Sequence, residues 1–207
     1  MRRELSPDRR IEFYAPGELE KIMAGEMGIG DERVLAATNE ASRPALIAVT
    51  ALQTFGGARL EEALRLDWEA LHRTPGYVEI SGQHAKTRKR RLLEVGPGLA
   101  EWLVQFKGWT GRIWSQPVNS FITEWARLRE AVGVPSRRNG VRHGFASFSY
   151  VLQGEIETAA LAGTSPQILH ENYRGLARRE EAEAWFAIQP PKMADNLVAL
   201  ATVVANP

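Results

Sequence analysis

One segment, GGARLEEALRLDWEALHRTPGYVEISG (residues 56–82), changes its hydrophobic period half-way along. After its glycine pair, apolar residues recur at helical spacing, which predicts a loop and then an amphipathic helix within 56–71. From residue 74, apolar and polar residues alternate between a Pro-Gly pair and a further glycine, which predicts a β-strand over 74–82. The next segment, KTRKRRLLEV (86–95), is predicted to be a second strand, so that the two form a small antiparallel hairpin with basic residues at its turn.

Helical patterns flank this hairpin on both sides. Helices are predicted over 16–25, 44–54, 99–106, 118–132, 141–153, 155–162, 180–188 and 193–205, with a further one starting at Pro166. The segment 28–43 is weakly patterned and is predicted to include a loop. The fold class is therefore mainly α with a small antiparallel β-sheet (α+β). We expect 1–15 to be a lead-in or linker, 16–188 to be one domain and 189–207 to be a C-terminal helical tail.

The composition excludes several classes of protein. With 207 residues and 44% hydrophobic residues, the chain is long enough to bury a core without covalent cross-links. It has no cysteine, which rules out disulfides and thiol catalysis. Its four histidines show no ligand-like spacing, so no metal site is expected. No signal-peptide pattern and no run of about 18 apolar residues occurs, so we expect a cytoplasmic protein without membrane spans.

The charged residues are unevenly distributed. The net charge is only +1, but basic residues cluster in KTRKRR (86–91), SRRNGVRH (136–143) and RGLARR (174–179). Concentrated basic segments can form a DNA-binding face on a protein that is nearly neutral overall. Each cluster taken alone is equally compatible with an ordinary solvated surface.

Four motifs follow one another along the chain. They are GARLEE (57–62) with LDW (66–68), KT (86–87), NGVRHGFA (139–146), and LAGTSP (161–166) with Tyr173 seven residues after its proline. In this order and spacing the sequence resembles the catalytic domain of the tyrosine recombinases, the phage integrase family, from about residue 15 to 188. The resemblance implies the DNA breaking-rejoining fold of that family and places its catalytic domain in residues 16–188.

The resemblance implies two catalytic arginines, Arg59 and Arg142. A planar guanidinium can bind two phosphate oxygens at once, and two of them would neutralise the pentavalent phosphorane. Glu62 lies one helical turn beyond Arg59 and could orient it. The spacing of Arg59 and Glu62 is also that of an ordinary surface ion pair.

The resemblance also implies a general acid and a nucleophile. Lys86 would protonate the leaving 5′ oxygen; alternatively it contacts backbone phosphates, as Arg88, Lys89 and Arg90 are expected to do. Tyr173 would attack the DNA phosphate and form a 3′-phosphotyrosyl bond, a step that requires neither ATP nor metal nor another cofactor. An unperturbed phenol has a pKa of about 10, so it needs cationic surroundings and a nearby base.

Two positions depart from the family pattern. Asn139 stands where the family usually has histidine; an amide can donate a hydrogen bond but cannot shuttle a proton. Thr164 stands where the family has histidine or tryptophan, and capping the next helix explains it equally well. We expect His143 to be a packing residue, as is usual beside this arginine in the family, and His170, one turn before Tyr173, is a candidate helper by spacing alone.

The predicted partner is double-stranded DNA, bound by a homo-oligomer, a tetramer in this family. The predicted DNA-binding residues are Arg88, Lys89, Arg90, Arg137, Arg138 and Arg174. The tail 189–207 is expected either to dock on a neighbouring protomer or to close the core of its own chain. We expect no separate DNA-clamping domain, such as often precedes this catalytic domain, within these 207 residues.

The predicted function is site-specific DNA recombination or integration, as in mobile elements. The departures at Asn139 and Thr164 favour an alternative, a DNA-binding relative with a weakened or inactive site. A type IB topoisomerase shares the chemistry, but the motif spacing is that of recombinases. An unrelated helical scaffold with chance matches would lack salt-sensitive DNA binding, which distinguishes it from the other three.

Overall fold

The computed structural model describes residues 11–81 and 90–191. Its helices are α1 (Pro16–Glu26), α2 (Glu32–Ala37), α3 (Arg43–Gly56), α4 (Leu60–Leu64), α5 (Pro97–Leu103), α6 (Val118–Ala131), α7 (Gly140–Gln153), α8 (Glu155–Ala162), α9 (Pro166–Tyr173) and α10 (Arg179–Phe186). Three short 3-10 helices are η1 (Glu40–Ser42), η2 (Trp68–Leu71) and η3 (Val104–Phe106), and two strands are β1 (Tyr77–Ile80) and β2 (Arg91–Glu94). The predicted fold class, mainly α with one small antiparallel sheet, is confirmed.

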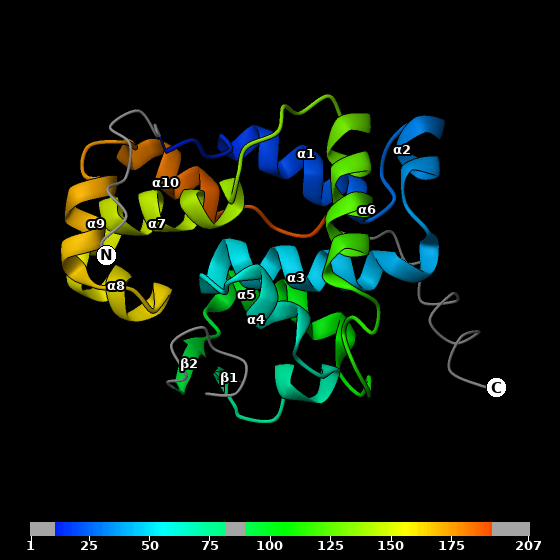
Figure 1. The fold of residues 1–207 in the computed structure, drawn as a ribbon, viewed down its shortest axis with the longest axis horizontal. Coiled ribbons are helices and arrows are strands. Elements are labelled where there is room, and N and C mark those ends of the chain that lie inside the picture. The colour runs from blue at the N-terminus through cyan, green and yellow to red at the C-terminus, as the bar shows by residue number, and fades with distance from the viewer. Residues whose placement is uncertain (1–10, 82–89, 192–207) are drawn as a thin grey trace, which may run out of the picture.

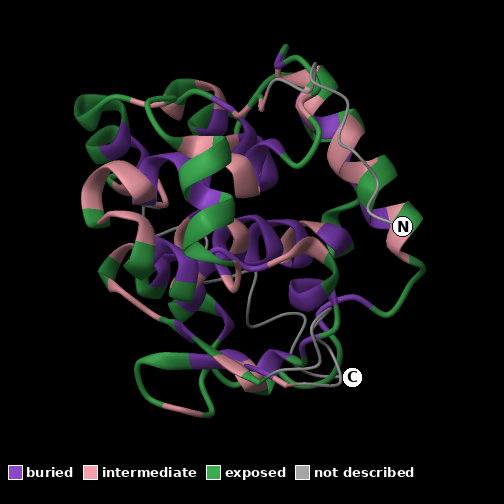
Figure 2. Ribbon diagram, turned by 60° about the vertical axis from the view of Figure 1, so that its left-hand side comes forward, coloured by how far each residue is buried: buried purple, intermediate pink, exposed green. Residues whose placement is uncertain are grey.

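The central element is α3, in the middle of the view in Figure 1. Every residue from 45 to 52 is buried, as expected for a helix that is apolar on all sides. Helices α1, α7 and α10 lie on one side of α3, and α5 and the β1–β2 hairpin lie on the other (Figure 1). The main cluster of buried apolar side chains joins these elements, and Figure 2 shows the buried segments gathered inside the molecule.

The hairpin pairs β1 and β2 antiparallel, with Ile80 opposite Arg91 and Val78 opposite Leu93. Val78, Ile80 and Leu93 are fully buried. Since side chains of a strand alternate between its two faces, Arg91 lies on the same, inward face as Leu93. The predicted turn, including Lys86, lies outside the described residues.

The helix predicted within 56–71 is shorter than expected. Helix α4 ends at Leu64, and the chain then runs alongside residues 111–113. Trp68 donates its backbone N–H to the Gly111 oxygen at 2.8 Å, and the Leu66 oxygen accepts from Ile113 at 3.1 Å. These long-range hydrogen bonds replace the helical ones that the local sequence pattern suggested.

The weakly patterned segment 28–43 includes loop residues, as predicted, together with two short helices. Asp31 begins α2, its carboxylate accepting from the backbone N–H groups of Arg33 and Val34 at 3.0 and 3.1 Å. Asn39 begins η1 in the same way, accepting from Ala41 at 3.1 Å. Both are N-caps, which stabilise short helices too weakly amphipathic to be detected by periodicity.

Helix α10 fixes the end of α3 against α7. The Trp185 indole donates to the Thr54 oxygen at 3.1 Å, and a Cβ on Gly144 would lie 2.5 Å from the Trp185 ring. Gly144 therefore allows α7 and α10 to pack in close contact. The predicted helix 193–205 and residues 1–10 lie outside the described part of the chain. No helix within the described ranges is long and apolar enough to cross a membrane.

Candidate active site

Glu62 is the carboxylate around which the candidate site is built. Its side chain is 1% exposed and binds two arginines: Arg59 Nη1 at 2.7 Å and Arg91 Nη2 at 2.5 Å. It also accepts from the Arg59 backbone N–H at 3.0 Å, which begins α4. Burial alone would raise the pKa of Glu62, but the hydrogen bonds from Arg59 and Arg91 outweigh it, so the pKa is lowered and the group is ionised at neutral pH.

Gly57 forms the turn that brings Arg59 to this position. Its φ of 63° is left-handed, and a Cβ there would lie 2.3 Å from the Phe145 ring, so the position requires glycine. Its carbonyl oxygen accepts from both Arg142 Nη1 and Arg91 Nη2. The glycine of the first motif therefore also supplies an acceptor for two guanidinium groups of the site.

The end of α8 supplies the other acceptors. The last carbonyls of a helix have no partner within the helix and carry the negative end of its dipole. Arg91 Nη1 donates to the Leu161 oxygen at 2.6 Å and Arg142 Nη2 to the Ala162 oxygen at 2.6 Å. Gly163 is left-handed, at φ 61°, and its oxygen accepts from Arg59 Nη2 at 2.5 Å.

Arg59, Arg91 and Arg142 thus lie together around a single carboxylate. Three guanidinium charges against that of Glu62 leave two positive charges uncompensated. Burial, together with the charges of Arg59 and Arg91, lowers the pKa of Arg142 to about 10, so it stays charged at neutral pH. An adjacent cavity of about 660 Å³ is lined by Arg59, Arg142, Asn139 and Gln53, and an anion entering it would meet this positive charge.

Tyr173 lies at the end of α9 and contacts α7. It packs against a small cluster made of Ala146, Ala159 and Leu169. Its hydroxyl lies 2.7 Å from His143 Nδ1. Burial raises the pKa of Tyr173, and the charge of Arg142 offsets part of that rise. Burial and Arg142 together lower the pKa of His143.

The comparisons with solved structures agree with this architecture. Two crystal structures of the XerH site-specific recombinase, bound to difH substrates after and before cleavage, match with TM-scores of 0.53 and 0.50 at 16% and 17% sequence identity. They cover 98% of this chain, which spans 56% of theirs. The chain has the fold of a tyrosine recombinase catalytic domain.

The remaining comparisons give no further support for the fold. The catalytic domain of bacteriophage HP1 integrase is similar at 16% identity over 96% of both chains, with a TM-score of 0.47. A scan against models of protein families finds no match. A search of curated protein sequences finds none either.

The two positions that depart from the family pattern occupy different surroundings. Asn139 is exposed, immediately before α7, with φ 55° and ψ 24°. Asparagine tolerates this left-handed conformation better than most residues. Thr164 is half-buried after Gly163, and Ser165, not Thr164, caps α9 by accepting from the Ile168 backbone at 3.3 Å.

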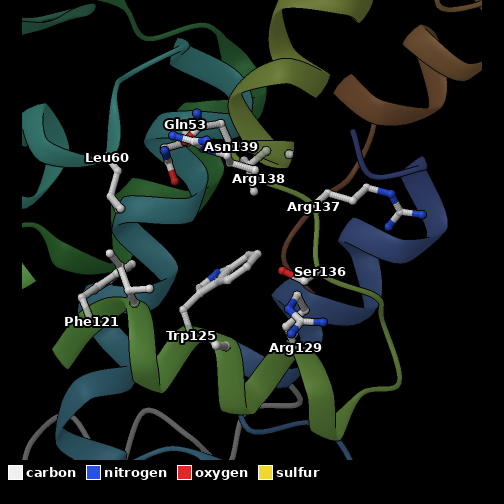
Figure 3. Close-up of a pocket in the computed structure, with 13 residues that line it drawn as sticks. Gln53, Leu60, Phe121, Trp125, Arg129, Ser136, Arg137, Arg138 and Asn139 are labelled. Atoms are coloured by element: carbon white, nitrogen blue, oxygen red, sulfur yellow. The ribbon is translucent and has the colours of Figure 1, made fainter. Parts of the chain in front are cut away.

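The predicted DNA-binding residues are partly engaged within the fold. Arg90 pairs with Glu79 at 2.7 Å. Arg137 pairs with Glu18 at 2.9 Å and lies over the Tyr14 ring. Figure 3 draws a second pocket, between Trp125, Arg129 and Asn139, and shows the Arg137 side chain at its edge, extending toward α1. Arg138 and Arg174 are exposed. Lys86, Arg88 and Lys89 lie outside the described residues.

The structure adds to the two expectations about histidine, and one residue of the site was missed. His143 does more than pack, because it bonds the Tyr173 hydroxyl. His170 is exposed and bonds Glu155 at 3.0 Å, whereas the histidine that bonds the Tyr173 hydroxyl is His143. Arg91 was not among the predicted site residues; its place on the inward face follows only once Leu93 is known to be buried. Within the described ranges, no group of three or more acidic, histidine or cysteine side chains could hold a metal ion.

Proposed function

We propose that this chain cuts and rejoins DNA strands in site-specific recombination, with Tyr173 as the nucleophile. The supporting observation is that three motifs far apart in sequence meet at one point. Arg59 and Arg142 bond adjacent carbonyls, those of Gly163 and Ala162, and thereby form one positive site beside a cavity. The half-buried Tyr173 lies close to this site, since its hydroxyl is 2.7 Å from Nδ1 of His143, the residue that follows Arg142.

The proposed reaction has two steps. In the first, Tyr173 Oη attacks a DNA phosphorus atom, and the bond from phosphorus to the 5′ oxygen breaks in line with it. Arg59 and Arg142 stabilise the charge that develops on the non-bridging oxygens. Lys86 donates the proton that the leaving 5′ oxygen requires. In the second step, a 5′ hydroxyl from another strand attacks the phosphotyrosine and releases Tyr173.

Double-stranded DNA is the proposed partner. The XerH structures contain DNA substrates, and the exposed Arg138 and Arg174 here could contact phosphates. Phosphate contacts supply most of the salt-sensitive affinity of such proteins. From the family resemblance of the sequence motifs, we also propose that the chain acts as a homo-oligomer, a tetramer, on DNA.

The test is capture of SDS-stable protein–DNA adducts from cells expressing the full chain. We expect adducts with the wild type and none with Tyr173→Phe, which retains the ring but lacks the oxygen. Sequencing the attached DNA identifies the target. Adducts that persist in Tyr173→Phe would assign the nucleophile elsewhere.

A DNA-binding protein that does not cut is the second candidate. One observation favours it: Asn139 occupies the place of a usual catalytic histidine and has no group that can carry a proton. Salt-sensitive DNA binding without adducts from the wild type would support this reading. Substituting Asn139→His would then be expected to produce adducts.

A further inference from the structure

The proposed reaction requires the Tyr173 hydroxyl to lose its proton as its oxygen attacks phosphorus. Burial raises the pKa of this phenol above its ordinary value, and Arg142 offsets only part of the rise. Tyr173 is therefore protonated at neutral pH, and the neighbouring arginine charge alone does not ionise it. A side chain that accepts the proton is needed.

Asn139 cannot fill this role. It is exposed, and its side-chain amide does not titrate near neutral pH. Thr164 has a hydroxyl, which is also a poor base. Arg142 is already protonated and is bound to carbonyl oxygens, so it cannot accept a further proton.

We infer that His143 is the proton acceptor for Tyr173, an inference that rests on the proposed function. The two residues are 30 positions apart, and the packing of α7 against α9 brings His143 Nδ1 to 2.7 Å from the Tyr173 hydroxyl. This lies within the heavy-atom distance required for direct proton transfer. The rings are tilted by 38°, with centroids 5.8 Å apart.

The surroundings favour the neutral form of His143, which is the form that can accept a proton. Burial and the adjacent Arg142 lower its pKa. On α8 and α9, Glu155 and His170 face each other at the surface and form their own pair. The remaining charged side chains on these two helices, Glu157, Glu171 and the flanking Arg174, are exposed.

The other two helices that pack against α7, namely α3 and α10, place no charged side chain beside His143 and Tyr173. Helix α3 has one charged residue, Arg43, which bonds Thr38 and the Leu35 oxygen at its far end. Helix α10 packs on α7 through Trp185, and its charged residues are exposed. Arg142 is therefore the charge that acts on His143 among the described residues.

The proton balance is then complete. As the Tyr173 Oη–P bond forms, the hydroxyl proton moves to His143 Nδ1 and the ring becomes an imidazolium. The electron pair of the breaking P–O bond goes to the 5′ oxygen, which takes its proton from the general acid of the proposed reaction. In the rejoining step, the imidazolium returns its proton to the departing Tyr173 oxygen.

The first test compares His143→Asn with the wild type, using the duplex recovered from wild-type adducts as substrate. Asparagine keeps an amide near the position of Nδ1 but cannot take a proton. Loss of a general base typically costs roughly 10²–10⁴-fold in rate. We expect a loss in this range at pH 7, and a rate that rises with pH where the wild-type rate is level.

Replacing Tyr173 by 3,5-difluorotyrosine separates a base from a merely positioning residue. The fluorines acidify the phenol and so reduce its need for a base. We therefore expect this replacement to raise the cleavage rate of His143→Asn by a much larger factor than that of the wild type. His170→Asn is the matched control, a nearby histidine already paired with Glu155, and should leave the rate unchanged. A His143→Asn rate within threefold of the wild type, with the same pH profile, would overturn the inference.

The second test needs no DNA. N-acetylimidazole acetylates tyrosine hydroxyls, and peptide mass analysis of the full chain measures each site. We expect Tyr173 to react at least tenfold faster at pH 7 in the wild type than in His143→Asn, while Tyr77, which is 42% exposed, reacts equally in both. Equal Tyr173 rates would refute base assistance. Faster wild-type acetylation without DNA adducts would retain the inference and reject the proposed cleavage.

Discussion

Glu26 is a buried carboxyl whose ionisation should make the stability of the protein depend strongly on pH. It is fully buried, and its Oε1 accepts from Thr50 Oγ1 at 2.5 Å and from Trp125 Nε1 at 3.0 Å. Its Oε2 has no hydrogen-bond partner. Burial raises the pKa from 4.5 to about 8, although the two hydrogen bonds oppose the rise. The protonated form is therefore the one that the folded state favours.

The size of the effect follows from the difference in pKa between the folded and unfolded chains. Because the folded pKa is raised, the stabilisation is fully present below pH 4.5 and is lost as the pH rises toward 8. Unfolding releases a proton in this window, so stability falls by about 1.4 kcal/mol per pH unit. Between pH 5 and pH 8 the loss from this one group is about 3.5 kcal/mol.

Glu26→Gln tests this directly, because the amide oxygen can keep both hydrogen bonds and the side chain no longer ionises. We expect the free energy of unfolding of the variant, relative to that of the wild type, to rise by about 3.5 kcal/mol from pH 5 to pH 8. Urea unfolding followed by circular dichroism measures it. Glu130→Gln, an exposed position on α6, makes the same charge change and should show no such trend. A stability difference between Glu26→Gln and the wild type that stays constant from pH 5 to 8 would refute the reasoning.

Three further predictions concern the site. Gly57→Ala should lower the free energy of unfolding, measured in urea, by about 2–5 kcal/mol, because it combines left-handed strain with a clash against Phe145. Gly133→Ala, at φ 72° with no neighbour within 4 Å, should lower it by only about 1 kcal/mol. Glu62→Gln should lose about 3–5 kcal/mol of stability at pH 7, and the loss should shrink only as the pH falls below the unfolded value of 4.5 and through the lowered folded pKa, where the contribution of ionised Glu62 disappears. Arg91→Lys keeps the charge but cannot reach a carboxylate and two carbonyls at once, so both adduct yield and the urea midpoint should fall.

The sequence predicted most elements because their signals are local. The apolar face of 118–132 and the proline at the start of α9 correspond closely to α6 and α9. The helix expected within 56–71 was too long because the hydrogen bonds that end it come from residues 111–113, more than 40 positions away. No window of local sequence contains that information.

The residues of the site also divide into those with a local sequence signal and those placed by long-range packing. The motif spacing identified Arg59 and Arg142, and the fold brings them together. Arg91 was missed because Leu92 and Leu93 are both apolar, which leaves open which of them faces inward. The structure resolves this: Leu93 is buried and Leu92 is 44% exposed, so Arg91 turns inward to Glu62. The contact of His143 with Tyr173 depends on helix packing, which sequence spacing cannot predict.

The acceptors of the arginine cluster explain how three cations can be held close together without losing their charge. A carboxylate for each guanidinium would fix its position but would also cancel its field. Here Arg142 is held by the oxygens of Gly57 and Ala162, and Arg59 and Arg91 share Glu62 and also donate to other carbonyls, although Arg91 Nε is buried without a partner. Carbonyl oxygens satisfy the donors while adding no net charge.

The positive potential beside the cavity is therefore a consequence of backbone geometry, namely the left-handed turn at Gly57 and the end of α8. It is independent of the side chains at 139 and 164. On the proposed mechanism, asparagine in place of a histidine at 139 would weaken proton transfer while leaving anion binding intact, and a histidine elsewhere in contact with Tyr173, the proposed nucleophile, would suffice to restore the chemistry.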